Sequence, residues 1–267
     1  MAMLAVERSA LHNALRSAAG QIAGMIRDLP DTGVALPGAR WTVGDAAAHL
    51  AHAKGLAARI CAGEMLRYGD GTVAGLAPAN EGFLTEYAER NGRVLADLLV
   101  ENTESFIRVA SELPEDAILP MFLGPMSPAV TESYMLTHLL MHGSAIAKAL
   151  RKPYPIDAEL VELALPFLRA SVPLFVNEQE AAGLTARFEI RLRRGSRLTV
   201  RFDEGKASVE ERPAGRVDCH ISADPVAFLL LAAGIEGQWG LIARGKLMTW
   251  GRKPWLALKL TKVIVAP

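Results

Sequence analysis

The chain has 267 residues, enough for one large domain or two domains of ordinary size. Apolar residues make up 51% and charged residues 22%, which favours a packed core and argues against disorder. Lysine plus arginine and aspartate plus glutamate both total 29, so the formal charge is zero and no basic run offers nucleic acid a binding surface.

Two helices are predicted at the start of the chain. Apolar residues recur at helical spacing from about residue 6 to residue 29, and a loop rich in proline and glycine follows. Thr42 is a favourable N-cap, and Asp45 stands three residues later, where it can complete a capping box. The second helix is therefore expected to begin after Thr42 and to end near Cys61.

Two further helices complete a predicted bundle. The glycine-rich stretch 68–79 is typical of a loop, and a third helix is predicted over 80–113. Ser127 can cap a fourth helix, which runs to Leu150. Four helices with connections of moderate length predict a four-helix bundle over residues 1–152.

The pattern changes in the second half of the chain. A helix is predicted over 159–176, and another follows Asp224, which can cap it. Four short segments alternate apolar and polar residues and are predicted strands: 188–194, 197–202, 206–212 and 217–222. We therefore expect a helical domain followed by an α+β domain over residues 153–267.

Histidine spacing indicates a metal site in the bundle. His138 and His142 are four residues apart on one predicted helix, so both imidazoles leave the same face. Two such nitrogens can converge on one ion at about 2.0–2.1 Å, and His49 on the second helix is the best third ligand. His52 fits a helix surface or a supporting contact better, and Asp45 is placed to orient the ring of His49. The alternative is that the histidines are hydrogen-bonded core residues.

Three sequence segments carry a family resemblance. WTVGD at 41–45, AHL at 48–50 and HG at 142–143 resemble the DinB-like metal-binding bundle, and more specifically its mycothiol-dependent maleylpyruvate isomerase branch. CHISADPVAFLLLAAG at 219–234 and GKLMTWGRKPWLALKL at 245–260 resemble the sterol-carrier-like domain that follows the bundle in that branch.

The resemblance implies a zinc ion on His49, His138 and His142, with mycothiol or a similar thiol as cosubstrate of an isomerase or transferase. Imidazole ligands also suit iron and nickel. The chain departs from the branch at two positions: His138 replaces a glutamate ligand, and Ala145 replaces an aspartate. Three neutral ligands still leave zinc its full charge and an open position, where water in place of the thiol would give hydrolysis.

Arg252 is the candidate catalytic residue of the second domain, since a guanidinium can pair with the carboxylate of a small anionic substrate. Arg244 is a weaker candidate of the same kind, and both also fit a surface role. The competing function is a carrier of apolar lipid or acyl ligands, without catalysis and with a structural metal. Trp41 is expected to staple the start of the second helix within the core.

The remaining features indicate which cellular compartment and which assembly to expect. Cys61 and Cys219 lie far apart, so no disulfide framework is indicated and a reducing cytoplasm is expected. The apolar run 226–235 is far shorter than the roughly 20 residues of a membrane span. A mean hydropathy of +0.19 predicts apolar surface hidden in a cavity or a subunit interface, with a homodimer as the default assembly.

Overall fold

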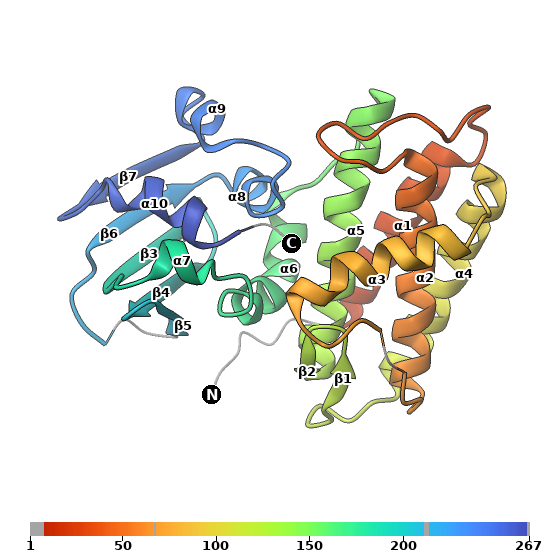
Figure 1. Cartoon of the computed structure of the whole chain (residues 1–267), viewed down its shortest axis with the longest axis horizontal. Coiled ribbons are helices and arrows are strands. Elements are labelled where there is room, and N and C mark those ends of the chain that lie inside the picture. Colours follow the sequence, from red (N-terminus) through yellow and green to blue (C-terminus); the bar gives the residue numbers. More distant parts are fainter. Residues whose placement is uncertain (1–7, 67, 211–213, 266–267) are drawn as a thin grey trace. The chain divides into compact units, whose positions relative to one another are not determined.

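The computed structural model describes residues 8–66, 68–210 and 214–265, and the chain divides after Pro155 into two units (Figure 1). The predicted fold class is confirmed: the first unit is helical, and the second combines helices with a five-stranded sheet. None of the described helices is long and apolar enough to cross a membrane. The predicted start of the first helix, at residue 6, lies outside the described residues.

Four long helices form the bundle of the first unit. They are α1 (Arg8–Ile26), α2 (Val43–Cys61), α4 (Gly92–Ser111) and α5 (Pro128–Leu150). Helix α4 packs against α1 and α2, and α1 also packs against α5. On α4 the buried residues Leu95, Leu99 and Phe106 recur at helical spacing, so one apolar stripe faces the core. Burial of these stripes is the main source of the bundle's stability.

Both predicted N-caps of the bundle are confirmed. Thr42 Oγ1 accepts a hydrogen bond from the backbone N–H of Asp45, and the Asp45 carboxylate accepts one from the backbone N–H of Thr42 at 2.9 Å. Ser127 caps α5, with Pro128 in the first turn. The capping box fixes the first turn of α2, and Leu50, eight residues after Thr42, is completely buried.

The predicted third helix over 80–113 is wrong. The structure instead has α3 (Val73–Glu86), a break, and then α4, whose N-cap Asn91 accepts from the N–H groups of Arg93 and Val94. The predicted loop over 68–79 is confirmed only for residues 68–72, because the glycines and Pro78 of the rest are typical of a loop but form the first half of α3. No described residue of α3 is buried, so contacts with the bundle, rather than a core of its own, hold α3 in place.

The segment between α4 and α5 was also expected to be a loop, and it contains a short hairpin. Strand β1 (Leu119–Met121) pairs antiparallel with β2 (Gly124–Met126). Gly124 has φ +105°, a backbone conformation that favours glycine. The hairpin packs against α2 and α5, and its residues Met121 and Phe122 are buried.

A buried polar cluster joins α1 to α5. Glu132 is almost completely buried, and its carboxylate lies 3.1 Å from Arg8 and 3.3 Å from His12. Burial raises the pKa of Glu132 to about 7, although the charge of Arg8 opposes the shift.

Cys61 is buried near the end of α2, and burial raises the pKa of its thiol to about 12, as expected for a small buried hydrophobe.

The sheet of the second unit has the strand order β5-β4-β3-β6-β7. Its strands are β3 (Ala186–Leu192), β4 (Arg197–Asp203), β5 (Lys206–Glu210), β6 (Cys219–Ala223) and β7 (Leu247–Gly251). Strands β3 and β6 are parallel and the other neighbours are antiparallel. The four predicted strands correspond to β3 to β6, and the predicted strand over 206–212 ends within residues that are not described.

One face of this sheet is apolar and the other is polar. Phe188, Ile190 and Val200 are buried on the first face. The opposite face carries residues such as Glu189 and His220, which are paired across β3 and β6. The helices of the unit are α6 (Ala158–Ser171), α7 (Glu178–Ala181), α8 (Pro225–Ala232), α9 (Gln238–Ala243) and α10 (Leu256–Val263). Asp224 caps α8 as predicted.

The predicted helix over 159–176 is shorter in the structure. Helix α6 ends at Ser171, and Val172 is its C-cap. Pro173 follows at once and has no backbone N–H to continue the helical hydrogen bonds, which explains the early end.

Candidate metal centre

Three histidines meet between α2 and α5. His49 comes from α2, and His138 and His142 come from successive turns of α5. One potential ligand atom of each lies within 4.8 Å of the others, and the two α5 rings have centroids 4.7 Å apart. His49 Nε2 lies 2.8 Å from His138 Nε2. The structure thus brings together the three residues that the sequence singled out.

The donor set fits a zinc ion. Tetrahedral coordination with bonds of about 2.0–2.1 Å places two ligand nitrogens about 3.3 Å apart. The two Nε2 atoms of His49 and His138 are slightly closer than this, and His142 lies within 4.8 Å, so side-chain rotations of modest size bring all three to that spacing. Imidazole is also the commonest ligand type for zinc and other divalent transition metals in proteins.

The three rings are neutral at physiological pH. Burial is the largest cause, and it lowers the pKa of His49 and of His138 well below the ordinary range. Burial, together with the positive charge of Lys54, lowers the pKa of His142 to about 4. A metal must compete with protons for imidazole, so a site whose histidines stay unprotonated binds it without that penalty.

A buried lysine supports the centre. Lys54 has no exposed surface, and its Nζ lies 3.3 Å from His138 Nδ1. Burial lowers the pKa of Lys54 to about 7. A neutral amine can accept the Nδ1–H of His138, and this tautomer leaves the Nε2 lone pair directed toward His49 and the centre.

Sequence reasoning missed Lys54. The available signal was a lysine in the alanine-rich, apolar segment AAAHLAHAKGLAARI, five residues after His49. A lysine on such a segment either extends to solvent or is buried with an altered pKa.

Trp41 closes one side of the centre. Its ring lies 4.9 Å from His49 and is stacked 5.8 Å from His142, and its Nε1 donates to Glu81 of α3 at 2.8 Å. Trp41 was expected to be a core residue, but it is partly exposed and links the histidines to α3. His52 packs face to face on Phe83 of α3 at 3.7 Å and does not belong to the three-histidine group.

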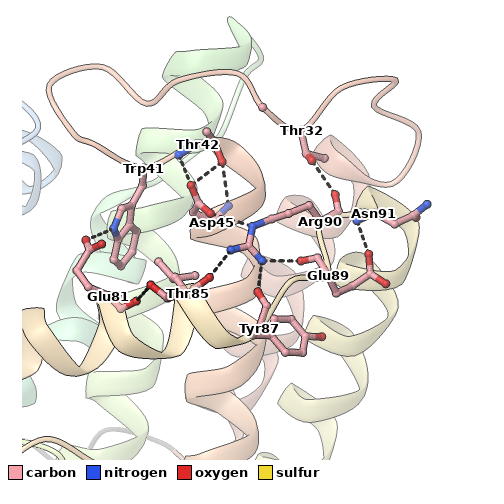
Figure 2. A network of polar contacts seen from close by, with 12 residues as sticks. Thr32, Trp41, Thr42, Asp45, Glu81, Thr85, Tyr87, Glu89, Arg90 and Asn91 are labelled. Carbon is pink, nitrogen blue, oxygen red and sulfur yellow. Dashed lines mark hydrogen bonds and ion pairs between the residues drawn. The ribbon is translucent and has the colours of Figure 1, made fainter.

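Arg90 ties the capping box of α2 to the end of α3 (Figure 2). Its Nε donates to Asp45 at 2.8 Å, and its other nitrogens donate to the carbonyls of Leu84, Tyr87 and Glu89. Burial opposes ionisation of Asp45, but the hydrogen bonds from Thr42 and Arg90 outweigh it and lower the pKa of that carboxyl.

Asp45 therefore does not have the role expected of it. Its carboxylate accepts hydrogen bonds from Thr42 and Arg90, whereas the buried Nδ1 of His49 has no hydrogen-bond partner among the described residues. The capping box directs the carboxylate toward the start of α2, away from the ring one turn later.

Replacing Arg90 with methionine is expected to lower the free energy of unfolding of the bundle by about 2 kcal/mol, because four hydrogen bonds are lost in a partly buried site. Urea unfolding followed by circular dichroism measures the change. Arg93→Met is the matched control: its ion pair with Asp28 is exposed on both sides, so a loss of about 0.5 kcal/mol or less is expected. Equal losses of stability in the two variants would contradict the claim that Arg90 holds the end of α3 against the start of α2.

The candidate residues of the second unit lie apart from this cluster in the sequence. Arg252 follows β7, its side chain is half exposed, and its nearest carboxylate oxygen is on Asp218 at 3.7 Å. Arg244 forms an ion pair with Glu236. His220 lies 3.5 Å from Glu189 and stacks on Trp250.

The fold and the site define a class of protein: a helical bundle with three converging histidines, followed by an α+β unit. The sequence model of the mycothiol maleylpyruvate isomerase N-terminal domain matches residues 9–147, and the chain belongs to this family. The SCP-2 sterol transfer family matches residues 174–264. Both parts of the resemblance seen in the sequence are confirmed.

Solved structures agree with this assignment. The crystal structure of the mycothiol-dependent maleylpyruvate isomerase has a TM-score of 0.56 at 13% identity, covering 91% of this chain and 93% of that chain. A mutant of that isomerase with one histidine changed to alanine has a TM-score of 0.58 at 12% identity and the same coverage. At such identities the likeness shows a shared fold. The search of curated proteins gave no match.

Proposed function

We propose that this protein is a zinc-dependent isomerase or transferase that uses mycothiol, or a related small thiol, as cosubstrate in the cytoplasm. The observation that carries the proposal is the group of three buried or half-buried neutral histidines, His49, His138 and His142, within 4.8 Å of one another. Family membership supports the thiol, because the matched family is named for mycothiol.

The histidines would hold the metal. Zinc on three neutral protein ligands supplies a Lewis acid with an open position, which lowers the pKa of a bound thiol. Lys54 holds His138 in the tautomer that presents Nε2, and Trp41 limits water on the side of His49 and His142. Helix α3, attached through Glu81 and Arg90, positions Trp41 against the site.

The chain has no carboxylate at Ala145, where the mycothiol-dependent branch carries an aspartate. A proton-transfer step that uses that acid is therefore not available from this position. Arg252 is proposed to bind an anionic group of the substrate, which agrees with its half-exposed guanidinium and its single long contact with Asp218. A homodimer is the proposed assembly.

The test is an activity assay of the zinc-loaded protein with mycothiol and maleylpyruvate, followed by a panel of other small thiols and unsaturated acids. We expect turnover that requires the thiol and is lost in His142→Ala, while His52→Ala retains it, since His52 contacts Phe83 rather than the three-histidine group. A zinc-loaded protein that neither binds a thiol nor converts any substrate of the panel would contradict the proposal.

A second function is favoured by one observation, the match of residues 174–264 to the SCP-2 sterol transfer family. In that case the protein carries an apolar lipid or acyl ligand, and the metal stabilises the bundle. Mass spectrometry of organic extracts from the purified protein distinguishes the two: a stoichiometric lipid together with no thiol-dependent turnover favours the carrier.

A further inference from the structure

Large apolar side chains are exposed around one edge of the second unit. Strand β7 is an outer strand of the sheet, next to β6, and helix α9 packs against it (Figure 1). Three of the four tryptophans of the chain lie here, and they are 40% to 66% exposed. We call this the β7 edge surface; its exposed residues are Trp239, Ile242, Met248, Trp250 and Trp255.

The side chains come from three adjoining segments. Trp239 and Ile242 are three residues apart on α9, so they share one face of that helix. Met248 and Trp250 are two residues apart on β7, so they project from the same face of the sheet. Trp255 is the N-cap of α10, four residues after β7 ends. An exposed group of this size on a protein surface marks a site of association.

The same stretch of sequence is strongly basic. Residues 237–267 contain no aspartate or glutamate. They contain six basic residues: Arg244, Lys246, Arg252, Lys253, Lys259 and Lys262. Carboxylates from elsewhere pair with four of them: Glu236 with Arg244, Asp224 with Lys246, and Asp218 with both Arg252 and Lys253. Within the part of the chain that the structure describes, cations therefore remain in excess, and Arg193, which donates to the Gly245 carbonyl, adds to them.

The excess positive charge indicates which of two partners can bind along this outer strand. A second copy of the chain would bring the same cations face to face, and like charges along an outer strand oppose edge-to-edge pairing. An anionic surface would instead attract them. Tryptophan is also the residue most suited to a membrane interface, where its ring meets acyl chains and its N–H meets water and headgroups.

We propose that the β7 edge surface docks onto an anionic lipid bilayer. Trp239, Trp250 and Trp255 enter the headgroup region, and the lysines and arginines around them contact lipid phosphates and carboxylates. Contact through the edge of the sheet allows side chains on either side of β7 to reach the bilayer together. Such docking would hold the second unit at the surface where apolar ligands reside, and it does not depend on the function proposed for the bundle.

The test is co-sedimentation of the full-length protein with vesicles of phosphatidylcholine, with and without phosphatidylserine. We expect binding to the anionic vesicles that weakens with added salt, and a blue shift of the tryptophan fluorescence. The double variants Trp239→Ser/Trp255→Ser and Lys259→Glu/Lys262→Glu should each weaken binding at least about tenfold.

Met65→Ser/Ile118→Ser is the matched control, because it removes two exposed apolar residues of the first unit and should leave binding unchanged. All substituted side chains in the tryptophan and control variants are exposed, and circular dichroism verifies folding. Equal binding to both kinds of vesicle, or no binding to either, would overturn the proposal. So would a dimer in sedimentation that Trp239→Ser/Trp255→Ser converts to a monomer.

Discussion

Replacing His138 with alanine is expected to weaken zinc binding by roughly 10²–10³-fold, because one of three ligands is lost. Structural zinc sites with four ligands bind with about 10–16 kcal/mol, so one ligand accounts for about 2.5–4 kcal/mol. His138 is also the ring in contact with both His49 Nε2 and Lys54 Nζ, so its loss removes the central member of the group.

Competition with a chromogenic chelator measures the affinity of the wild type and the variant. The matched control is His52→Ala: His52 stands three residues after His49 on α2 but packs on Phe83, so a change of less than about tenfold is expected. Equal losses in the two variants would show that the metal binds elsewhere or that the substitutions act through the fold. A wild type that competes no better than His138→Ala would also exclude the site.

Replacing Lys54 with methionine is expected to have opposite effects on stability and on metal binding. Burial lowers the pKa of Lys54 to about 7 from its ordinary value of about 10.5, so folding at neutral pH displaces a proton or buries a charge. At Lys54 the folded metal-free protein therefore binds fewer protons than the unfolded chain between pH 7 and pH 10. This group alone should contribute a rise in stability of about 3–4 kcal/mol across that window, measured as the difference between wild type and variant, because the buried thiols and phenols whose pKa values burial raises lower the stability of both proteins alike.

Lys54→Met should lose this rise and should be more stable than the wild type at pH 7. Urea unfolding of chelator-treated protein at pH 7 and pH 10 measures the difference, and Lys148→Met, at an exposed position of α5, should keep the pH dependence of the wild type. The histidines and Glu132 titrate at or below about pH 7, and they contribute little above it.

The same variant should bind zinc about 10- to 100-fold more weakly, since His138 loses the group that fixes its tautomer. A Lys54→Met protein with unchanged metal affinity would show that Lys54 has no supporting role. If the free energy of unfolding changed with pH in the same way in the variant and the wild type, Lys54 would be protonated in the folded state.

Much of the centre was predictable because it depends on short-range rules. The spacing of His138 and His142 places both rings on one face of a helix, and the capping box at Thr42 and Asp45 sets where α2 begins. The pairing of α2 with α5 depends on tertiary contacts, so the local sequence could name His49 as the best third ligand but could not place it beside α5.

The parts that sequence reasoning missed depend on contacts between distant segments. Helix α3 has no buried residue of its own and contains Pro78, so its apolar pattern is weak, and Arg90 and Trp41 hold it against α2. The environment of Lys54 depends on the packing of α2 against α5 and is invisible in the local sequence. Local pattern therefore predicted the three-histidine group better than the residues that surround it.

The metal content of the protein tests the central claim most directly. Elemental analysis should be applied to wild type and His142→Ala, both purified without chelator and without a nickel affinity step. A metal centre on the three histidines predicts about one zinc ion per wild-type chain and a loss of most of it in the variant. A folded wild type that contains no divalent metal, and takes up none when zinc is added, would contradict it.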